Sequence, residues 1–171
     1  MNSINGNSSS YPRVSILLDR LRSAHNVGNI FRLAEAVAAS EIICCGYTAA
    51  PPHPKLEKTA MGADKMVPCR IFETASAAID SLRQEGYAQI LAVEAETNSC
   101  DALDFDYQFP LAIVLGNEAL GVSREALDKV DGIVSLPMLG QKASINVGNC
   151  AAVVLYAITR KIRMNQGKNI S

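Results

Sequence analysis

The sequence predicts one α/β domain with a mostly parallel sheet and helices on both of its faces. Short apolar runs of strand length alternate along the chain with longer helix-like segments, which is the pattern of such a fold. The 171 residues are enough for a single core, and no internal repeat divides them. We expect the domain to span residues 13–164, between a disordered tail over residues 1–12, rich in Asn and Ser, and a short tail over residues 165–171.

The first elements follow from short apolar runs and from residues that end or begin helices. A strand is predicted over residues 14–18, where Val, Ile and Leu cluster. A helix is predicted over residues 26–38, with Asn26 as its N-cap because an Asn side chain can accept a hydrogen bond from the first turn. The second strand covers residues 41–45. Three prolines then indicate that residues 47–64 form a loop with one short helix.

The middle of the chain adds a short strand over residues 66–72 and a helix over residues 74–85, capped by Thr74 and ended near Gly86. Two further runs are apolar and rich in β-branched residues, which is typical of strands buried on both faces. They cover residues 89–94 and residues 111–115. The acidic segment between them, residues 97–110, is expected to be irregular.

The last third of the chain predicts two helices and one strand. Ser123 caps a helix that runs to about Val130, residues 132–136 form the last strand, and residues 147–163 form the final helix. The apolar residues of this final helix fall at i, i+3, i+4, i+7 and i+11, and therefore on one face. They are Ala151, Val154, Leu155, Ile158 and Ile162.

Composition excludes several classes of protein. Apolar residues make up 49% of the chain and charged residues 19%, as in an ordinary soluble globular protein. No apolar run approaches the ~18 residues that a membrane helix needs. The five cysteines form no Cys-x-x-Cys pair, which predicts buried free thiols in a reducing cytoplasm and no metal site. The glycine patterns of dinucleotide and phosphate-loop sites are absent after the first strand.

The net charge of −1 conceals an uneven distribution along the chain. Residues 1–70 carry eight Lys or Arg against five Asp or Glu, residues 71–131 carry three against twelve, and residues 132–171 carry five against none. A basic surface around a site would suit an RNA partner, with the acidic part facing elsewhere. Ordinary solvated faces explain the same distribution, so charge alone identifies no partner.

Three polar segments stand out because each lies beside an apolar run. Asn, Gly and Ser cannot build a core, so their concentration where strands meet helices indicates a site assembled from separated pieces. The segments cover residues 25–32, 115–121 and 136–147, and read HNVGNIFR, LGNEALG and LPMLGQKASINV.

In this order and spacing, the three segments resemble the signature motifs of the SpoU/TrmH family of RNA ribose 2'-O-methyltransferases, which belongs to the knotted SPOUT superfamily. The resemblance covers about residues 14–163. It implies a deep C-terminal trefoil knot, a cytoplasmic homodimer, and S-adenosylmethionine as the methyl donor for a ribose of tRNA or rRNA. Two alternatives remain open: a knotted RNA-binding module without activity, and a methyltransferase of the same superfamily that modifies a base.

The resemblance also implies which residues carry the chemistry. Arg32 closes the first motif and is assigned to activation of the 2'-hydroxyl. Since arginine stays protonated, we expect it to hold a phosphate or stabilise alkoxide charge rather than act as a base. Asn26 matches the first motif, although its role as a helix cap explains it equally well. Glu118 matches the second motif, and Ser144 and Asn146 match the Ser-x-Asn of the third, where they either hold ligand groups or cap the last helix.

The cofactor is expected at the carboxyl ends of the strands, where open α/β sheets bind their ligands. Gly116 ends a buried strand there, and its missing side chain would let a flat adenine approach the backbone. The resemblance implies that Gly116, Leu136 and Ile145 hold S-adenosylmethionine. The further wall residues are expected to be Leu91, Ala92, Leu115, Asn117 and Met138. For Leu91, Ala92 and Leu115, a place in the core is an equally good explanation.

Contacts to RNA phosphates are expected from basic residues near the motifs. These are Arg20, Arg22, Lys55, Lys58 and Lys142. Each of them, taken alone, is also explained as an ordinary surface charge. No metal is expected to take part in the reaction.

Overall fold

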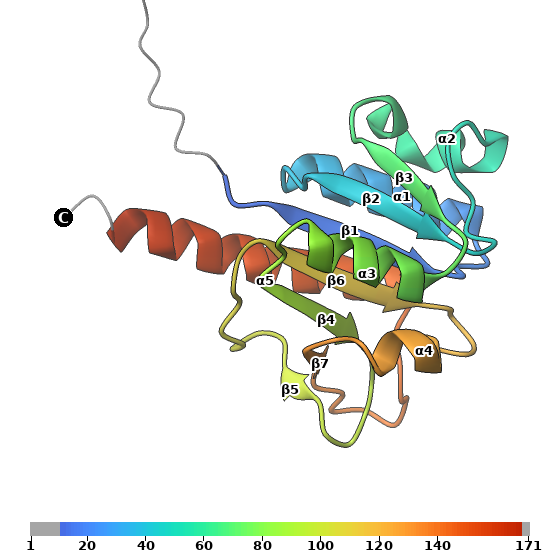
Figure 1. The fold of residues 1–171 in the computed structure, drawn as a ribbon. Helices are drawn as coiled ribbons and strands as arrows, with labels where there is room; N and C mark the ends of the chain where they lie inside the picture. The colour runs from blue at the N-terminus through green and yellow to red at the C-terminus, as the bar shows by residue number, and fades with distance from the viewer. Residues whose placement is uncertain (1–10, 169–171) are drawn as a thin grey trace, which may run out of the picture.

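The computed structural model describes residues 11–168, which fold around one seven-stranded sheet (Figure 1). All six pairings between neighbouring strands are parallel, in the order β3-β2-β1-β6-β4-β7-β5. The strands are β1 (Val14–Asp19), β2 (Glu41–Cys45), β3 (Cys69–Phe72), β4 (Gln89–Val93), β5 (Cys100–Asp101), β6 (Leu111–Gly116) and β7 (Gly132–Ser135). The predicted fold class, a parallel sheet in an α/β domain, is confirmed.

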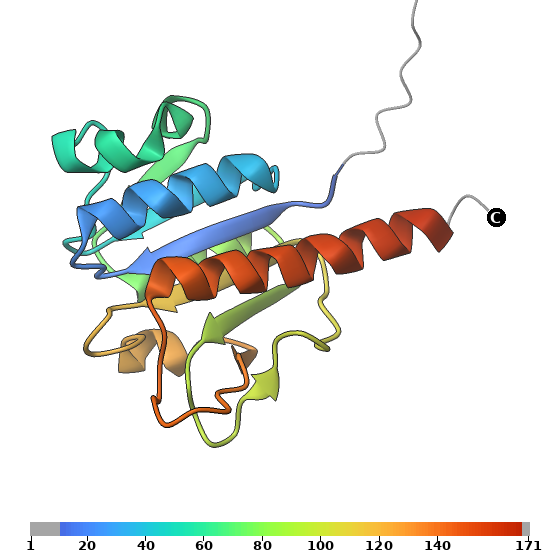
Figure 2. The ribbon, with the colours of Figure 1, turned by 180° about the vertical axis from the view of Figure 1, so that it is seen from behind.

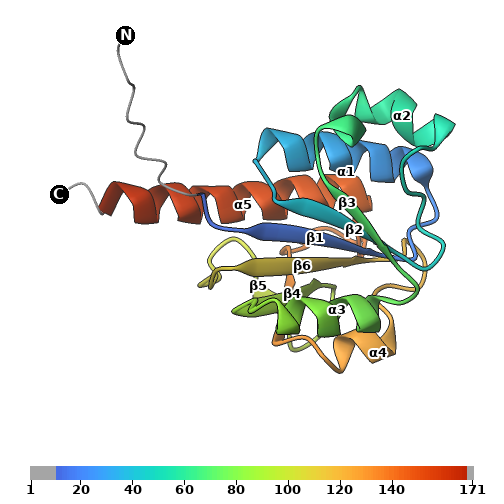
Figure 3. The same ribbon diagram turned by 45° about the horizontal axis from the view of Figure 1, so that its top comes forward.

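Helices cover both faces of this sheet, as the sequence predicts (Figure 3). One face carries α1 (Ala24–Ala36), α2 (Pro54–Ala60) and α5 (Val147–Lys168), with the 3-10 turn η1 (Ala63–Lys65) beside α2. The other face carries α3 (Ala75–Gln84) and α4 (Arg124–Leu127).

The core therefore has two parts, and the strands supply both by alternation. In β1, Ile16 and Leu18 pack against the α1 and α5 side, while Leu17 packs against the α3 side. All three side chains are fully buried. Because the central strands β1, β2, β4 and β6 are covered on both faces, they are buried at nearly every position and mostly apolar, and this is why the sequence predicts them well.

Most predicted elements lie where the sequence indicates, with five corrections. The strand β3 begins at Cys69 rather than at residue 66, because the 3-10 turn η1 and its C-cap Met66 come before it. The helix α1 begins at Ala24, and its N-cap is Ser23 rather than Asn26. The helix after Ser123 ends at Leu127 instead of about Val130. The segment over residues 97–110 contributes the two-residue edge strand β5. Finally, α5 continues to Lys168 and so includes most of the predicted tail over residues 165–171.

The predictions for residues 1–10 and 169–171 lie outside the described residues. The apolar stripe of α5 is confirmed, because Ala151, Val154, Leu155, Ile158 and Ile162 are all buried. Within residues 11–168, no helix is both long enough and apolar enough to cross a bilayer. The trefoil knot stays a prediction.

The sheet order brings distant parts of the chain to one edge. The strand β6 lies between β1 and β4, so the ends of these strands are neighbours although they are far apart in sequence. Asp19 pairs with Gly116, and Val93 pairs with Leu115, at this carboxyl edge. The long helix α5 begins beside the same edge and runs back across the sheet (Figure 2). All three polar segments thus reach one region of the molecule.

Candidate functional site

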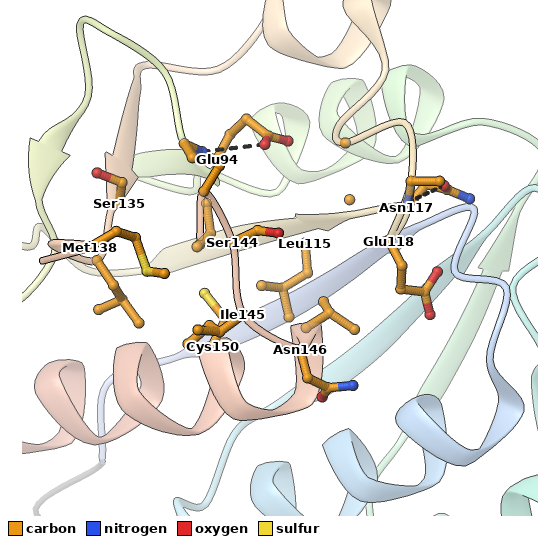
Figure 4. Close-up of a pocket in the computed structure, with 18 residues that line it drawn as sticks. Glu94, Leu115, Asn117, Glu118, Ser135, Met138, Ser144, Ile145, Asn146 and Cys150 are labelled. Carbon is orange, nitrogen blue, oxygen red and sulfur yellow. Dashed lines mark hydrogen bonds between the residues drawn. The ribbon is translucent and has the colours of Figure 1, made fainter. Parts of the chain in front are cut away.

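A cavity of about 610 Å³ opens at the carboxyl ends of β4, β6 and β7, where the segment before α5 closes it (Figure 4). This volume lies within the range of ligand pockets, roughly 300–1,000 Å³. Eighteen residues line the cavity: Val93, Glu94, Ala95, Leu115, Gly116, Asn117, Glu118, Ala119, Gly121, Ser135, Leu136, Met138, Ala143, Ser144, Ile145, Asn146, Val147 and Cys150. The second and third polar segments therefore supply most of its wall.

The turn after β6 is fixed by Asn117, whose side chain is almost completely buried. Its Nδ2 donates to the carbonyl of Arg20 at 2.7 Å and to the hydroxyl of Tyr47 at 2.8 Å. Its Oδ1 accepts from the backbone N–H groups of Ala119 and Leu120, both at 2.9 Å. Both N–H groups and both acceptor positions of this amide are thus used by protein partners, which fixes the turn.

Gly116 is required by the turn itself. A Cβ at this position would lie 2.2 Å from the backbone N of Val122 and 2.3 Å from the carbonyl carbon of Gly121. The space that a side chain would fill is therefore taken by the chain's own backbone. Gly116 lines the cavity, as the sequence predicts. The expected reason is wrong, because the space of its missing side chain is filled by backbone atoms of Gly121 and Val122 and is not open to an adenine.

The three polar segments are joined by a chain of side-chain hydrogen bonds through Asn26. The Nδ2 of Asn26 donates to Oε1 of Glu118 at 3.1 Å. The Nδ2 of Asn146 donates to Oδ1 of Asn26 at 3.2 Å. Residues from the first, second and third segments, separated by 92 and 120 positions in the chain, are thus in direct contact. Asn26 is a connector in the site and not the N-cap of α1.

Glu118 is held as a carboxylate at the start of α1. Partial burial acts against its ionisation, but hydrogen bonds outweigh that effect and lower the pKa of Glu118 below its ordinary value. The donors are the backbone N–H of Arg22 at 2.9 Å, the backbone N–H of Ser23 at 3.2 Å and the amide of Asn26. A negative charge at this place is also stabilised by the N-terminal end of α1.

Asn146 has two roles at the start of α5. Its Oδ1 accepts from the backbone N–H of Gly148 at 2.8 Å and of Asn149 at 3.3 Å, which is the geometry of an N-cap. Its Nδ2 reaches Asn26, and its side chain lines the cavity. Ser144 also lines the cavity and is exposed at its rim.

Arg32 lies on the exposed surface of α1 and is not one of the residues that line the cavity. Within residues 11–168 it forms no salt bridge, so its charge is available to a ligand or to another chain. A single chain therefore brings together four of the five predicted catalytic residues, namely Asn26, Glu118, Ser144 and Asn146, and leaves Arg32 outside the cavity.

Six of the eight predicted cofactor residues line the cavity: Gly116, Leu136, Ile145, Leu115, Asn117 and Met138. Leu91 and Ala92 do not, because they lie within β4 and are fully buried in the two parts of the core. The cavity wall begins with the next two residues, Val93, which ends β4, and Glu94, which follows it. The sequence analysis also missed Ser135 and Cys150, which lie at the end of β7 and in the first turn of α5.

The predicted RNA-binding residues divide into two groups. Arg22, Lys55, Lys58 and Lys142 are exposed. Arg20 is different, because its Nε lies 3.1 Å from Oδ1 of the buried Asp19, and its backbone has a positive φ of 57°. Its guanidinium thus has a protein partner at the end of β1, which makes Arg20 a poor candidate for a phosphate contact.

The cysteines are free thiols, but they are not all buried as expected. Cys44 and Cys45 are buried, whereas Cys100 is exposed on the edge strand β5. Burial, together with the nearby charge of Glu94, raises the pKa of Cys150 in the cavity wall. Within the part of the chain that is described, no group of three or more His, Cys, Asp or Glu residues is arranged to hold a metal ion.

Comparison with known proteins places this arrangement in a family. The profile of the SpoU rRNA Methylase family matches residues 13–156. The tRNA (guanosine(18)-2'-O)-methyltransferase of Thermus thermophilus is 32% identical over 150 residues, which cover 88% of this chain and 76% of that protein. The 23S rRNA (uridine(2479)-2'-O)-methyltransferase of Streptomyces viridochromogenes is 31% identical over 151 residues, covering 86% of this chain and 53% of that protein.

Solved structures give the same result. The SpoU methyltransferase AviRb from Streptomyces viridochromogenes superposes with a TM-score of 0.82 at 29% identity, over 90% of this chain and 61% of that chain. Its complex with the cofactor AdoMet superposes with a TM-score of 0.80, over 88% and 58% of the two chains. The chain spans 53–58% of the length of three of its curated relatives. Because the profile match covers most of the chain and includes all three polar segments, the chain belongs to the SpoU rRNA methylase family.

Proposed function

We propose that this protein is an S-adenosylmethionine-dependent RNA methyltransferase that methylates a ribose 2'-hydroxyl of tRNA or rRNA. The observation that carries the proposal is the contact of Glu118, Asn26 and Asn146 at the rim of one cavity, since it unites the three family motifs in a single site. Relatives whose names describe 2'-O-methylation of tRNA and of rRNA support this reaction class.

The cavity fits the proposed cofactor in its chemistry. Its walls combine apolar side chains, such as Leu115, Leu136 and Met138, with polar side chains at the rim. Among its lining residues are two carboxylates, Glu94 and Glu118, and no Lys, Arg or His. Such a lining favours a ligand with a positive charge, and S-adenosylmethionine carries a sulfonium. When bound, this group supplies an electrophilic methyl.

The residues of the chain then have to orient a weak nucleophile, the ribose hydroxyl. The frame of Asn26, Glu118 and Asn146 fixes the rim of the cavity from three segments. Arg32, on the same helix as Asn26, is the exposed cation that we assign to the RNA, where it holds a phosphate or stabilises charge on the sugar oxygen. Arg22, Lys55, Lys58 and Lys142 add charge for the phosphate backbone.

The proposal is tested by methylation of RNA from cells that lack the gene, with labelled S-adenosylmethionine and mapping of ribose methylation. The intact chain should modify a ribose, and Arg32→Ala should reduce transfer at least 100-fold, a loss typical of a missing transition-state contact. The affinity for S-adenosylhomocysteine should change less than about threefold. Labelling of a base, or S-adenosylhomocysteine binding without any methylated RNA, would contradict the proposal.

We also infer a cytoplasmic homodimer. Three apolar side chains of α5 are exposed on the single chain: Val153 (43%), Tyr156 (54%) and Met164 (50%). Tyr156 and Met164 also line a second hollow of about 410 Å³, together with Thr159, Arg160 and Arg163. A second copy packed on this face would cover them, and the molar mass in solution, measured by light scattering, tests the assignment. Unpaired thiols suit the reducing cytoplasm, where RNA substrates are found.

A further inference from the structure

Glu94 is the one carboxylate of the cavity wall that the three motifs do not explain. It follows the last residue of β4 directly and lines the cavity beside Leu115 and Ser135. Figure 4 shows its side chain above the cavity, on the side away from Asn146. Its position at a strand end makes it a candidate for ligand recognition.

The carboxylate of Glu94 is held in place by the backbone around it. Its Oε2 accepts from the backbone N–H of Val122 at 2.9 Å, and its Oε1 accepts from the N–H of Ala95 at 3.2 Å. Gly121 leaves the space that this group needs, because a Cβ there would lie 2.4 Å from Oε2. A carboxylate fixed from two sides in this way has a defined orientation before any ligand enters.

Both oxygens keep an acceptor position after these contacts. A carboxylate oxygen can accept two hydrogen bonds, and each oxygen of Glu94 accepts one from the protein. Within residues 11–168 Glu94 forms no salt bridge, and no lysine, arginine or histidine lines the cavity. The group therefore suits a ligand that presents two neighbouring hydrogen-bond donors, one to each oxygen. A vicinal diol has this property.

We propose that Glu94 determines specificity for the nucleoside part of the methyl donor by accepting hydrogen bonds from both ribose hydroxyls. This inference rests on the proposed function, because it takes S-adenosylmethionine as the ligand. In nucleotide-binding α/β proteins, a carboxylate near a strand end binds ribose hydroxyls in the same manner. Here the carboxylate comes from β4, next to the strand β6 that carries the second motif. The ribose of the donor thus lies at the β4 side of the cavity.

The inference is tested by titration calorimetry with S-adenosylhomocysteine and its 2'-deoxy and 3'-deoxy analogues. The wild-type protein should bind each deoxy analogue about tenfold more weakly or worse, as expected for a lost hydrogen bond to a charged group. Glu94→Ala should bind S-adenosylhomocysteine with a similar loss and should no longer distinguish it from the deoxy analogues. Glu94→Gln, which keeps the shape and an acceptor for Val122, should show a smaller loss of both affinity and discrimination.

Glu96→Gln is the matched control, since Glu96 is exposed two residues further along and does not line the cavity. It should bind all three ligands like the wild type. If Glu94→Ala still discriminates between the ligands, the residue only supports the turn and the inference is wrong. Circular dichroism of each variant separates that outcome from loss of the fold. Selective binding of S-adenosylhomocysteine without methylation of any RNA would leave the inference standing and reject the proposed function, whereas no binding by the wild type would reject both.

Discussion

At the scale of single residues, Gly116 illustrates how a site can be located correctly for an incomplete reason. A glycine after a buried strand predicts close approach of something to the backbone, and the cavity does lie there. What approaches at the Cβ position is the backbone of Gly121 and Val122, at the end of a turn that folds back to pair Asn117 with Gly121. The sequence gives no sign of which partner comes close.

Gly116→Ala is therefore expected to destabilise the protein. The added methyl would meet backbone atoms at 2.2 and 2.3 Å, which cannot move as a side-chain end can. Overpacking of this kind costs roughly 2 kcal/mol, or about 4–8 °C in Tm for a domain of this size, and the affinity for S-adenosylhomocysteine should fall with it.

Gly140→Ala is the control for this change. A Cβ at Gly140 meets nothing within 4 Å, so its Tm should stay within about 2 °C of the wild type. Thermal unfolding followed by circular dichroism measures both variants. Equal melting temperatures for the two would show that the turn yields easily and that the close contact at Gly116 carries little energy.

The other site residues divide according to the kind of information that locates them. Asn26, Glu118 and Asn146 are predictable because they belong to motifs, but the hydrogen bonds between them depend on a sheet order that brings residues 92 and 120 positions apart together. Glu94 carries no motif, and its part in the cavity follows only from where β4 ends. The end of this strand is predicted to within one residue, but the predicted wall residues, Leu91 and Ala92, lie too early in the strand and belong to the core.

At the scale of secondary-structure elements, the start of α1 shows why helix ends are harder to predict than helix centres. Ser23 and Asn26 are both good N-caps by residue type. In the structure Ser23 is the N-cap, and its Oγ accepts from the N–H of Asn26 at 3.2 Å. The side-chain amide of Asn26 is therefore available to contact Glu118 and Asn146. Tertiary contacts, which sequence patterns do not contain, decide between two equivalent caps.

Removal of the Ser23 side-chain cap tests how much it contributes to the free energy of unfolding. Ser23→Ala should lower the free energy of unfolding by about 1 kcal/mol, because the first turn of α1 loses its side-chain acceptor. Ser123→Ala is the matched control, since the side chain of Ser123 makes no capping hydrogen bond to α4. Its effect should stay within about 0.5 kcal/mol. Urea unfolding gives both values, and a loss in Ser123→Ala equal to that in Ser23→Ala would argue against the assignment of the caps.

Short elements are missed for a related reason. The strand β5 has two residues, Cys100 and Asp101, and it exists because β7 offers an edge for pairing. A strand of two residues is too short to show a hydrophobic period in the sequence. The long helix α5 is the opposite case, because a stripe of five buried apolar residues over twelve positions predicts it from sequence alone.

At the scale of the whole molecule, the two ends of the sheet have different tasks. The carboxyl edge carries the cavity, and the amino edge carries a polar network that ties β1, β2 and β3 to α3. Arg70 donates to Glu41 through Nε at 2.6 Å and through Nη2 at 2.8 Å, and to Glu85 through Nη1 at 2.7 Å. Glu41 also accepts from the hydroxyl of Ser15 at 2.8 Å, and that hydroxyl contacts Tyr87. This network thus lies at the opposite ends of the strands from the cavity.

This network predicts how stability depends on pH. The hydrogen bond from Arg70 lowers the pKa of Glu85 below its ordinary value, with smaller help from Ser81. A carboxyl group whose pKa is lower in the folded state stabilises the fold above its unfolded pKa, about 4.3, and that stabilisation is lost as the pH falls through the folded pKa. The free energy of unfolding should therefore decrease between about pH 5 and pH 3.

Glu85→Gln should remove part of this dependence. The variant should be less stable than the wild type at pH 7, by about 1 kcal/mol at most because the Glu85 side chain is 30% exposed, and the difference should shrink as the pH approaches 3. Glu125→Gln, an exposed carboxylate of α4 that has no ion-pair partner among residues 11–168, should keep the wild-type dependence. Urea unfolding at several pH values compares the three proteins. Since Glu85 lies at the edge opposite to the cavity, the affinity of Glu85→Gln for S-adenosylhomocysteine should match that of the wild type at pH 7, and a parallel loss of affinity would mean that the two edges are coupled through the sheet.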